Sequence, residues 1–438
     1  MNRRNFIKSA AAFSAAGLAV GAGLGMGTEP SPAQAAQATK TPPAIDPKTI
    51  RGYKPDMQYR PHGNTGVLLS ALGFGMLRLP SLSDRRTVDE AQTIEMLRYG
   101  IDNGINYVDT ARGYWNGQSE AAVGKALLNG YRDKVYLATK STLIAMRSES
   151  DFERMFDESR KALQTDVIDY YLLHHVTAKT WNESVLPFKV LDKIERYKQD
   201  GKIRFSGFSF HDNLALFKRV IRANPDWNFC QMIQNYLDTE YEAGFLGMKY
   251  AHERGIAVNC MQPLKAGFMV NPPKQVQAVF DSAQTKRTPL EWAFYYLWNM
   301  PEADLVISGM SNVAQVKENL EYARRSSVGM LGLEDLMIIR EATKRYREID
   351  GVTACTGCNN CSPACQKKVA IGSLIGSVWF NYKITGNKAS AESGYRNVPA
   401  PRGVNADVCD GCGQCLPKCP HNVDIPGVLR EMRNELKA

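Results

Sequence analysis

Apolar and polar positions along residues 58 to about 325 predict strands and helices in turn. Eight short apolar runs have the length and composition of buried strands, and segments with helical periodicity lie between them. The expected strands are residues 71–76, 105–110, 135–140, 168–174, 203–209, 229–235, 256–264 and 304–309. Eight β/α units over this length are typical of a closed (β/α)8 TIM barrel, the α/β fold that we expect for residues 58–345.

The segments between and before these strands support the same fold. Helical periodicity is seen at Ile94, Leu97 and Ile101, and a glycine ends several helical segments just before the next strand. Residues 59–67 predict a hairpin that closes the lower mouth of the barrel.

The first 35 residues have the order of an export signal. Arg3 and Arg4 give a basic start, a weakly apolar Ala/Gly run follows, and Ala33-Gln34-Ala35 resembles a cleavage site. The segment resembles a twin-arginine signal peptide, which implies a periplasmic or otherwise exported protein. A membrane helix is the alternative, but the run is rich in small residues and ends in Gly, Thr, Glu and Pro. Residues 36–57 hold four prolines and no periodicity, so we expect a linker there.

Composition and charge narrow the function only slightly. The chain has 438 residues, is 44% hydrophobic and carries a formal net charge of +9, of which +7 lies beyond Ala35. This small excess favours neither nucleic acid nor an anionic membrane as a partner. No stretch after the signal approaches the length of a membrane span, so we expect none in the mature chain.

Eight of the ten cysteines lie in the last 84 residues, in two runs with the spacing C-x2-C-x2-C-x3-C. The first run is Cys355, Cys358, Cys361 and Cys365, and the second is Cys409, Cys412, Cys415 and Cys419. This spacing is typical of bacterial two-cluster ferredoxins, in which the fourth cysteine of each run binds the other cluster. We therefore expect two 4Fe-4S clusters, with Cys419 completing the first set and Cys365 the second, in a small, mainly helical ferredoxin-like domain at residues 346–438.

Zinc and disulfides are the competing explanations of these cysteines. Structural zinc sites use paired C-x2-C arms, which would leave a third cysteine over in each run. Neighbours this close cannot all form disulfides with acceptable geometry.

Residues 369–385 and 425–436 are predicted to be helical. Cys230 and Cys260 stand alone in apolar runs and are expected to be packed thiols.

Four polar residues stand at or just beyond the C-terminal ends of three consecutive expected strands. Asp109 ends the second strand, Lys140 the third and His174 the fourth, and Tyr114 follows the second strand in its loop. Chemistry in a TIM barrel lies at this end of the strands. Each residue alone has an ordinary structural explanation, but the four together predict an active site.

Five stretches of the chain resemble the aldo/keto reductase family, in the same order. They are YRPHGNTG at 59–66, NYVDTARGY at 106–114, ATK at 138–140, DYYLLH at 169–174 and GKIR at 201–204. The resemblance implies a catalytic tetrad of Asp109, Tyr114, Lys140 and His174. In that tetrad Tyr114 protonates the carbonyl oxygen, and the Lys140 ammonium, held by Asp109, brings the tyrosine pKa down from about 10. His174 orients the carbonyl or assists the proton transfer.

The nicotinamide site that the family implies is matched only in part. Ser209 and Gln231 are in place, but Phe210 stands where the family has Asn, and Met261 stands where it has a stacking aromatic residue. The last loop and helix keep the spacing for the adenosine phosphate at Ser308, Asn312, Gln315 and Asn319. Gln315 replaces an Arg that often grips the 2′-phosphate, and an amide contributes far less than a guanidinium there. A bound NAD or NADP is therefore an open expectation, with no preference between the two.

Two more histidines lie near the expected tetrad. His175 stands where the family often has a bulky aromatic residue, so we expect it to form a wall of the pocket. His211 follows the end of a strand and can face the substrate.

Three functions fit these observations. The first is an exported oxidoreductase that acts on a small carbonyl or alcohol substrate through the tetrad, with the clusters passing electrons to or from a redox partner protein. The second is a conventional NAD(P)H-dependent reductase with structural clusters, and the third is an electron-transfer or binding module on an idle barrel. Export favours the first, because free reduced nicotinamide is not expected outside the cytoplasm. The tetrad argues against an idle barrel, whereas Phe210 and Met261 keep that function open.

Overall fold

The computed structural model describes residues 46–398 and 402–436. The expected signal peptide at residues 1–35 and the first part of the expected linker, residues 36–45, lie outside the described residues.

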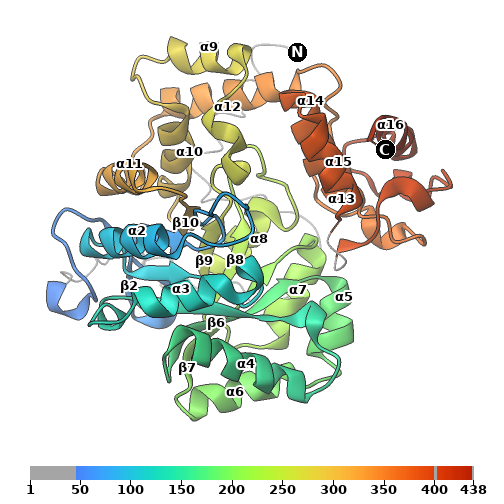
Figure 1. Cartoon of the computed structure of the whole chain (residues 1–438). Helices are drawn as coiled ribbons and strands as arrows, with labels where there is room; N and C mark the ends of the chain where they lie inside the picture. Colours follow the sequence, from blue (N-terminus) through green and yellow to red (C-terminus); the bar gives the residue numbers. More distant parts are fainter. Residues whose placement is uncertain (1–45, 399–401, 437–438) are drawn as a thin grey trace, which may run out of the picture. The chain divides into compact units, whose positions relative to one another are not determined.

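Eight parallel strands close into a barrel in the order β10-β3-β4-β5-β6-β7-β8-β9 (Figure 1). They are β3 (Leu72–Gly75), β4 (Tyr107–Asp109), β5 (Tyr136–Thr142), β6 (Ile168–Val176), β7 (Ile203–Phe210), β8 (Phe229–Ile233), β9 (Ala257–Met261) and β10 (Leu305–Gly309). Each falls within or overlaps one of the eight expected strands, so the predicted TIM barrel is confirmed. The parallel register places the C-terminal ends of all eight strands at one end of the barrel.

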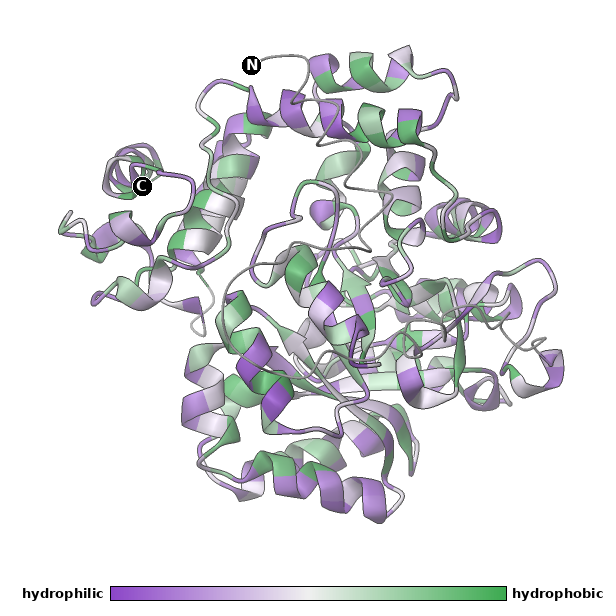
Figure 2. Cartoon of the chain, turned by 180° about the vertical axis from the view of Figure 1, so that it is seen from behind, coloured by the Kyte–Doolittle hydropathy of each residue, from purple (hydrophilic) through white to green (hydrophobic). Residues whose placement is uncertain are grey.

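Helices follow the strands, and most of them cover the outside of the barrel. They are α2 (Glu90–Asp102), α3 (Gln118–Ala126), α4 (Ser150–Leu163), α5 (Ala178–Thr180), α6 (Val190–Gln199), α7 (Leu214–Ala223), α8 (Gly244–His252), α9 (Lys274–Ser282), α10 (Pro289–Trp298), α11 (Val313–Arg324) and α12 (Leu333–Arg347). In α4 the buried residues Phe152, Met155, Phe156 and Leu163 follow the helical period. Figure 2 shows this pattern as alternating green and purple along the barrel helices. No helix within the described residues is long and apolar enough to cross a membrane.

The lower mouth of the barrel is closed by the predicted hairpin. β1 (Tyr59–Pro61) pairs antiparallel with β2 (Leu68–Ser70). Between them His62 is fully buried, with its Nε2 2.8 Å from Oδ1 of Asn259. Burial lowers the pKa of His62 to about 4, so this ring is neutral in the folded protein.

The C-terminal part of the expected linker is not a free tether. Ile50 and Met57 are buried, and the Nη1 of Arg51 lies 3.1 Å from Oδ1 of the buried Asp169. Apolar burial and this ion pair hold residues 50–57 on the barrel. The proline-rich sequence did not reveal these contacts, because Asp169 and the apolar surface that covers Ile50 and Met57 belong to distant segments.

The C-terminal region is mainly helical, as predicted. One continuous helical stretch is built from α13 (Ile371–Ser373), the π-helix η11 (Leu374–Trp379) and α14 (Phe380–Thr385), and α16 (Ile425–Leu436) is the second expected helix. A further helix, α15 (Lys388–Arg396), was not predicted. The two cysteine runs have the same local structure, because a short 3-10 turn follows the third cysteine of each, at Ser362–Ala364 and at Leu416–Lys418. This region packs around its own apolar core, which includes Trp379, Leu429 and Met432.

Candidate active site and iron-sulfur sites

Lys140 is the centre of a buried polar cluster where β4 and β5 end. Its Nζ lies 2.6 Å from each carboxylate oxygen of Asp109 and 2.7 Å from the carbonyl oxygen of Thr110. The same ammonium donates to the hydroxyl of Tyr114 at 3.2 Å. Because Asp109 and Lys140 are both buried, the pair is shielded from water and its geometry is well defined. The structure thus joins three of the four predicted tetrad residues through hydrogen bonds.

His174 joins this cluster through its ring. It lies at the C-terminal end of β6, and its ring meets the Tyr114 ring edge to face with centroids 5.7 Å apart. Burial, assisted by the positive charge of Lys140, holds the pKa of His174 well below its ordinary value. The imidazole is therefore neutral and can offer a hydrogen bond, but it cannot act as a cationic acid at neutral pH.

The pKa of Tyr114 corrects one expectation. Lys140 does lower this pKa, but burial of the phenol has the larger effect, and the net result is a pKa above 10. Lys140 itself keeps a raised pKa, because contacts with Asp109 and Tyr114 outweigh the burial that lowers it. At neutral pH the cluster therefore holds a protonated phenol next to an ammonium group.

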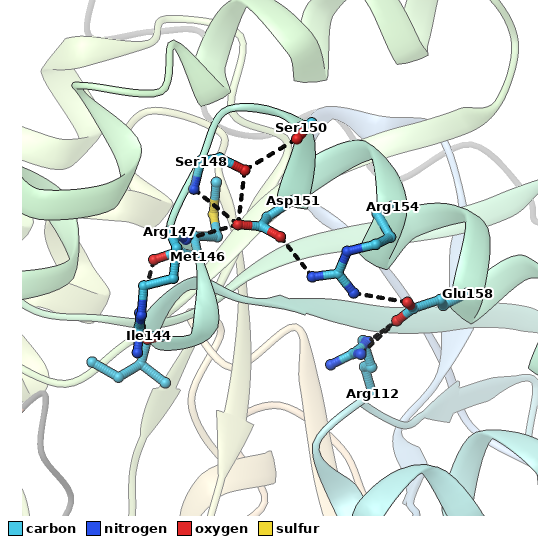
Figure 3. A network of polar contacts seen from close by, with 9 residues as sticks. All are labelled: Arg112, Ile144, Met146, Arg147, Ser148, Ser150, Asp151, Arg154 and Glu158. Atoms are coloured by element: carbon cyan, nitrogen blue, oxygen red, sulfur yellow. Dashed lines mark hydrogen bonds and ion pairs between the residues drawn. The ribbon is translucent and has the colours of Figure 1, made fainter.

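A surface network anchors the loop that carries Tyr114 (Figure 3). Arg112, two residues before Tyr114, donates from Nε to Oε2 of Glu158 on α4 at 2.8 Å. Arg154 bridges Glu158 and Asp151 at 2.8 and 2.6 Å, which fixes the start of α4. Each of these exposed pairs is weak alone, but together they connect the Tyr114 loop to a rigid helix.

Ser209 and Gln231 lie opposite each other on β7 and β8. The Ser209 hydroxyl accepts the backbone N–H of His175 at 2.8 Å, and Nε2 of Gln231 lies 3.9 Å from the sulfur of Met261. Oε1 of Gln231 is buried and has no hydrogen-bond partner within the described residues. A buried acceptor without a donor fits the carboxamide N–H group of a nicotinamide ring. Phe210, in contrast, packs edge to face on Phe217 of α7, so it belongs to the core.

The other predicted cofactor residues lie at the end of β10 and on the first two turns of α11. Asn312 caps α11 by accepting the N–H of Gln315 at 2.9 Å, and Asn319 donates to the Ser308 hydroxyl at 3.0 Å. Oε1 of Gln315 accepts the N–H of Ser311 at 2.7 Å, so this side chain braces its own loop. None of these four residues is a cation that could bind a 2′-phosphate. Ser209 and Gln231, on β7 and β8, fit a nicotinamide.

The sequence did not predict three residues of the site, which are Tyr241, Glu242 and Arg402. Tyr241 and Glu242 lie between β8 and α8, and Arg402 comes from the link between the cysteine runs. Arg402 contacts both of them and also His175 and His211. His175 and His211 lie with their rings 4.2 Å apart. Arg402 is 227 residues away from His175 in the chain, so no local pattern could have placed them together.

The eight cysteines fall into two groups that cross the sequence runs. Cys355, Cys358, Cys361 and Cys419 line one cavity. Burial raises the pKa of Cys415, and the nearby thiolate charges of Cys365, Cys409 and Cys412 raise it further. These are the two predicted ligand sets. No three His, Cys, Asp or Glu side chains in the described ranges converge closely enough to hold a single metal ion. The four thiols around the cavity of the first set fit a cubane, and the repeated cysteine spacing extends this fit to the second set.

The two cysteine sets have different surroundings. Gly357, in the loop of the first set, has a φ of +74° and lies so close to Tyr241 that a Cβ would overlap the ring. The carbonyl of Gly357 accepts the N–H of Glu242 at 3.1 Å. Cys412 of the second set is exposed. The first set therefore adjoins the barrel, and the second lies partly open to solvent.

Comparisons with known proteins agree with both parts of the structure. The profile of the aldo/keto reductase family matches residues 71–327, and that of a 4Fe-4S dicluster domain matches residues 354–424. The chain is 36% identical over 162 residues to aldo-keto reductase YhdN of Bacillus subtilis, which covers 35% of this chain and 47% of that protein. It is 29% identical over 297 residues to L-galactose dehydrogenase of Arabidopsis thaliana, covering 63% of this chain and 91% of that protein.

Solved structures show the same barrel. The holo form of an aldo-keto reductase from Bacillus halodurans is 25% identical, with a TM-score of 0.55 over 65% of this chain and 96% of that chain. An aldo-keto reductase from Klebsiella pneumoniae in complex with NADPH is 23% identical, with a TM-score of 0.54 over 65% of this chain and 94% of that chain, and supports the fold alone. Because the family profile spans more than half of the chain, the protein belongs to the aldo/keto reductase family of oxidoreductases and carries a 4Fe-4S dicluster domain after its barrel.

Proposed function

We propose that this chain is an exported oxidoreductase that acts on a small carbonyl or alcohol substrate through Asp109, Tyr114, Lys140 and His174. The eight C-terminal cysteines would hold two 4Fe-4S clusters, and these would supply electron transfer with a redox partner protein. The observation that carries the proposal is the position of Lys140 Nζ, which contacts Asp109 on one side and the Tyr114 hydroxyl on the other.

Each residue of the tetrad has its own role in carbonyl reduction. The neutral His174 imidazole donates a hydrogen bond that orients the carbonyl oxygen, and the Tyr114 hydroxyl gives that oxygen its proton. Lys140 stabilises the phenolate that remains, and Asp109 keeps the ammonium in place. A bound reduced nicotinamide would supply the hydride, with Gln231 and Ser209 holding its carboxamide.

The raised pKa of Tyr114 favours reduction over oxidation. A phenol that burial keeps protonated at neutral pH is ready to act as an acid, whereas alcohol oxidation needs a phenolate base. The reduction rate is therefore expected to stay level through neutral pH and to fall only at strongly alkaline pH, where Tyr114 loses its proton.

A second candidate is a conventional NAD(P)H-dependent reductase whose clusters are structural. The unpartnered Oε1 of Gln231 supports it, because that atom suits an exchangeable nicotinamide as well as a resident one. The two proposals differ in how a bound nicotinamide would regain its two electrons: from the clusters in the first, and by exchange with free reduced nicotinamide in the second.

One experiment separates them. The protein is purified anaerobically from the exported fraction, and any nucleotide released on denaturation is identified. The intact protein is then assayed on a panel of small aldehydes with reduced nicotinamide or with reduced methyl viologen as the electron source. Turnover with viologen supports the relay, turnover with nicotinamide alone supports structural clusters, and no turnover with either contradicts both.

A further inference from the structure

We infer that Arg402, a residue of the iron-sulfur domain, is a positioning residue of the barrel pocket. It holds the His211 and His175 rings in fixed tautomers beside His174. This inference rests on the proposed function of the tetrad, because His174 is the member of the tetrad that the two rings adjoin.

The guanidinium of Arg402 uses all of its nitrogens. Nη2 lies 2.6 Å from Nδ1 of His211 and 3.1 Å from Oε1 of Glu242, and Nε lies 3.4 Å from Nε2 of His175. Nη1 donates to the Tyr241 hydroxyl and to the Ser373 hydroxyl, each at 3.0 Å. The side chain is 14% exposed, so this arrangement is protected from water.

These contacts decide where the histidine protons lie. Arginine only donates, and its 2.6 Å contact with Nδ1 of His211 is shorter than the 3.2 Å contact of that nitrogen with Oε1 of Glu242. Nδ1 of His211 and Nε2 of His175 therefore accept. The proton of a neutral His211 is then on Nε2, and that of a neutral His175 is on Nδ1. Lysine could not impose this pattern, because its ammonium lacks the planar fork.

The charges around the two rings support neutral histidines. The groups that face them are His174, Asp212, Tyr241, Glu242 and Arg402, and Lys140 acts on His174. Burial, with Arg402 as a further cause, lowers the pKa of both His175 and His211. Burial raises the pKa of Glu242 to about 8, against the effect of Arg402, which lowers it. Without Arg402 the pKa of Glu242 would rise further, and its protonated carboxyl, 3.2 Å from Nδ1 of His211, would leave that ring free to change tautomer.

The backbone that delivers Arg402 is tied to the first cysteine run. Gly403 has a φ of +127°, and a Cβ there would overlap the carbonyl oxygen of Lys368. Val404 donates to that same carbonyl at 2.9 Å, and Ala370 donates to the carbonyl of Val404 at 2.9 Å. Residues 368–370 lie three to five positions after Cys365, so the fold of the iron-sulfur domain determines whether the guanidinium reaches the barrel.

The test follows the histidine rings by NMR and needs no substrate. Full-length protein with assembled, oxidised clusters is labelled with nitrogen-15 in its six histidines and titrated from pH 8 to pH 5. In the unchanged protein the three pocket rings are expected to remain neutral throughout. In Arg402→Met both rings are expected to stay neutral, because they remain buried, but each is expected to lose its single tautomer. Arg402→Lys should keep the His211 tautomer through one donated hydrogen bond but should not restore the His175 tautomer.

The control is Lys388→Gln, which removes one exposed charge from α15 and should leave all pocket rings unchanged. If the pocket rings of Arg402→Met stay neutral with unchanged tautomers, the inference is wrong. If Arg402→Met does not hold its clusters, Arg402→Lys decides the matter, because an unchanged His175 tautomer in that variant also overturns the inference. An inactive tetrad would leave these spectra unaffected, so failure of the proposed function is distinguishable from failure of this inference.

Discussion

At the scale of single residues, the proposed chemistry depends on Tyr114 and on what surrounds its hydroxyl. Lys140 contacts this hydroxyl and also lies 4.7 Å from the centre of the tyrosine ring. Sequence reasoning placed the four tetrad residues at one end of the barrel, but not the balance of effects on the tyrosine pKa. Burial decides that balance, and burial is a property of the closed pocket.

Tyr114→Phe is expected to reduce carbonyl turnover by about 10²- to 10⁴-fold, because it removes the proton donor and keeps the ring. The measurement is steady-state kinetics on an aldehyde that the wild type reduces, with binding of the aldehyde checked separately. Thermal stability should barely change, because Lys140 keeps its contacts with Asp109 and Thr110.

Lys140→Met serves as the companion variant. It removes the ammonium that opposes the effect of burial, so the pKa of Tyr114 should rise further and turnover should also fall. Unchanged turnover in Tyr114→Phe would refute the tetrad and favour an idle barrel.

His62 is expected to make folding stability depend on pH. The unfolded histidine gains a proton near pH 6.5, whereas the folded one, with a pKa of about 4, does not. The contribution of the neutral ring is therefore present above pH 6.5 and is lost as the pH falls from about 6.5 to 4. His62→Gln should show a smaller fall in melting temperature between pH 7 and pH 5 than the wild type. An equal fall in both proteins would show that His62 is not the source.

At the scale of elements, the repeated cysteine spacing was the strongest sequence signal. It predicted the crossing of the two sets, and the structure places Cys419 in the cavity lined by Cys355, Cys358 and Cys361. Strand and helix positions followed from apolar periodicity, which local sequence largely determines. Helix α15 and the packing of residues 50–57 were not predicted, because their buried faces exist only against distant segments.

Cys419→Ser should damage the cluster of the first cysteine run, although Cys419 belongs to the second run in sequence. Iron content is expected to fall from about eight to about four per chain, because each cubane holds four irons. Electron paramagnetic resonance of the reduced protein should show one cluster signal lost and the other kept. Cys260→Ala, which changes a buried thiol of β9, should retain all the iron. Zinc at one or two per chain in the wild type would contradict the cluster assignment.

At the scale of the whole molecule, export would bring the barrel and its clusters to the same compartment as a redox partner. The proposed recognition pair is Arg3 and Arg4. Replacing both by lysine should leave the unprocessed chain in the cytoplasm, as measured by fractionation and by the mass of the N-terminal peptide. Processed protein that still arrives outside would show that the pair is not the signal.

The sequence by itself predicted the barrel, the grouping of the cysteines and the position of the four proposed tetrad residues at one end of the barrel, because each has a local pattern: an apolar period, a repeated spacing, or a polar residue where a strand ends. Tertiary structure alone decided that Arg402 enters the barrel pocket and that residues 50–57 pack on the barrel. It also decided that burial raises the pKa of Tyr114. The physical reason is the same in each case: the deciding partner lies in another part of the chain or in the solvent that folding removes, and neither leaves a local pattern in the sequence.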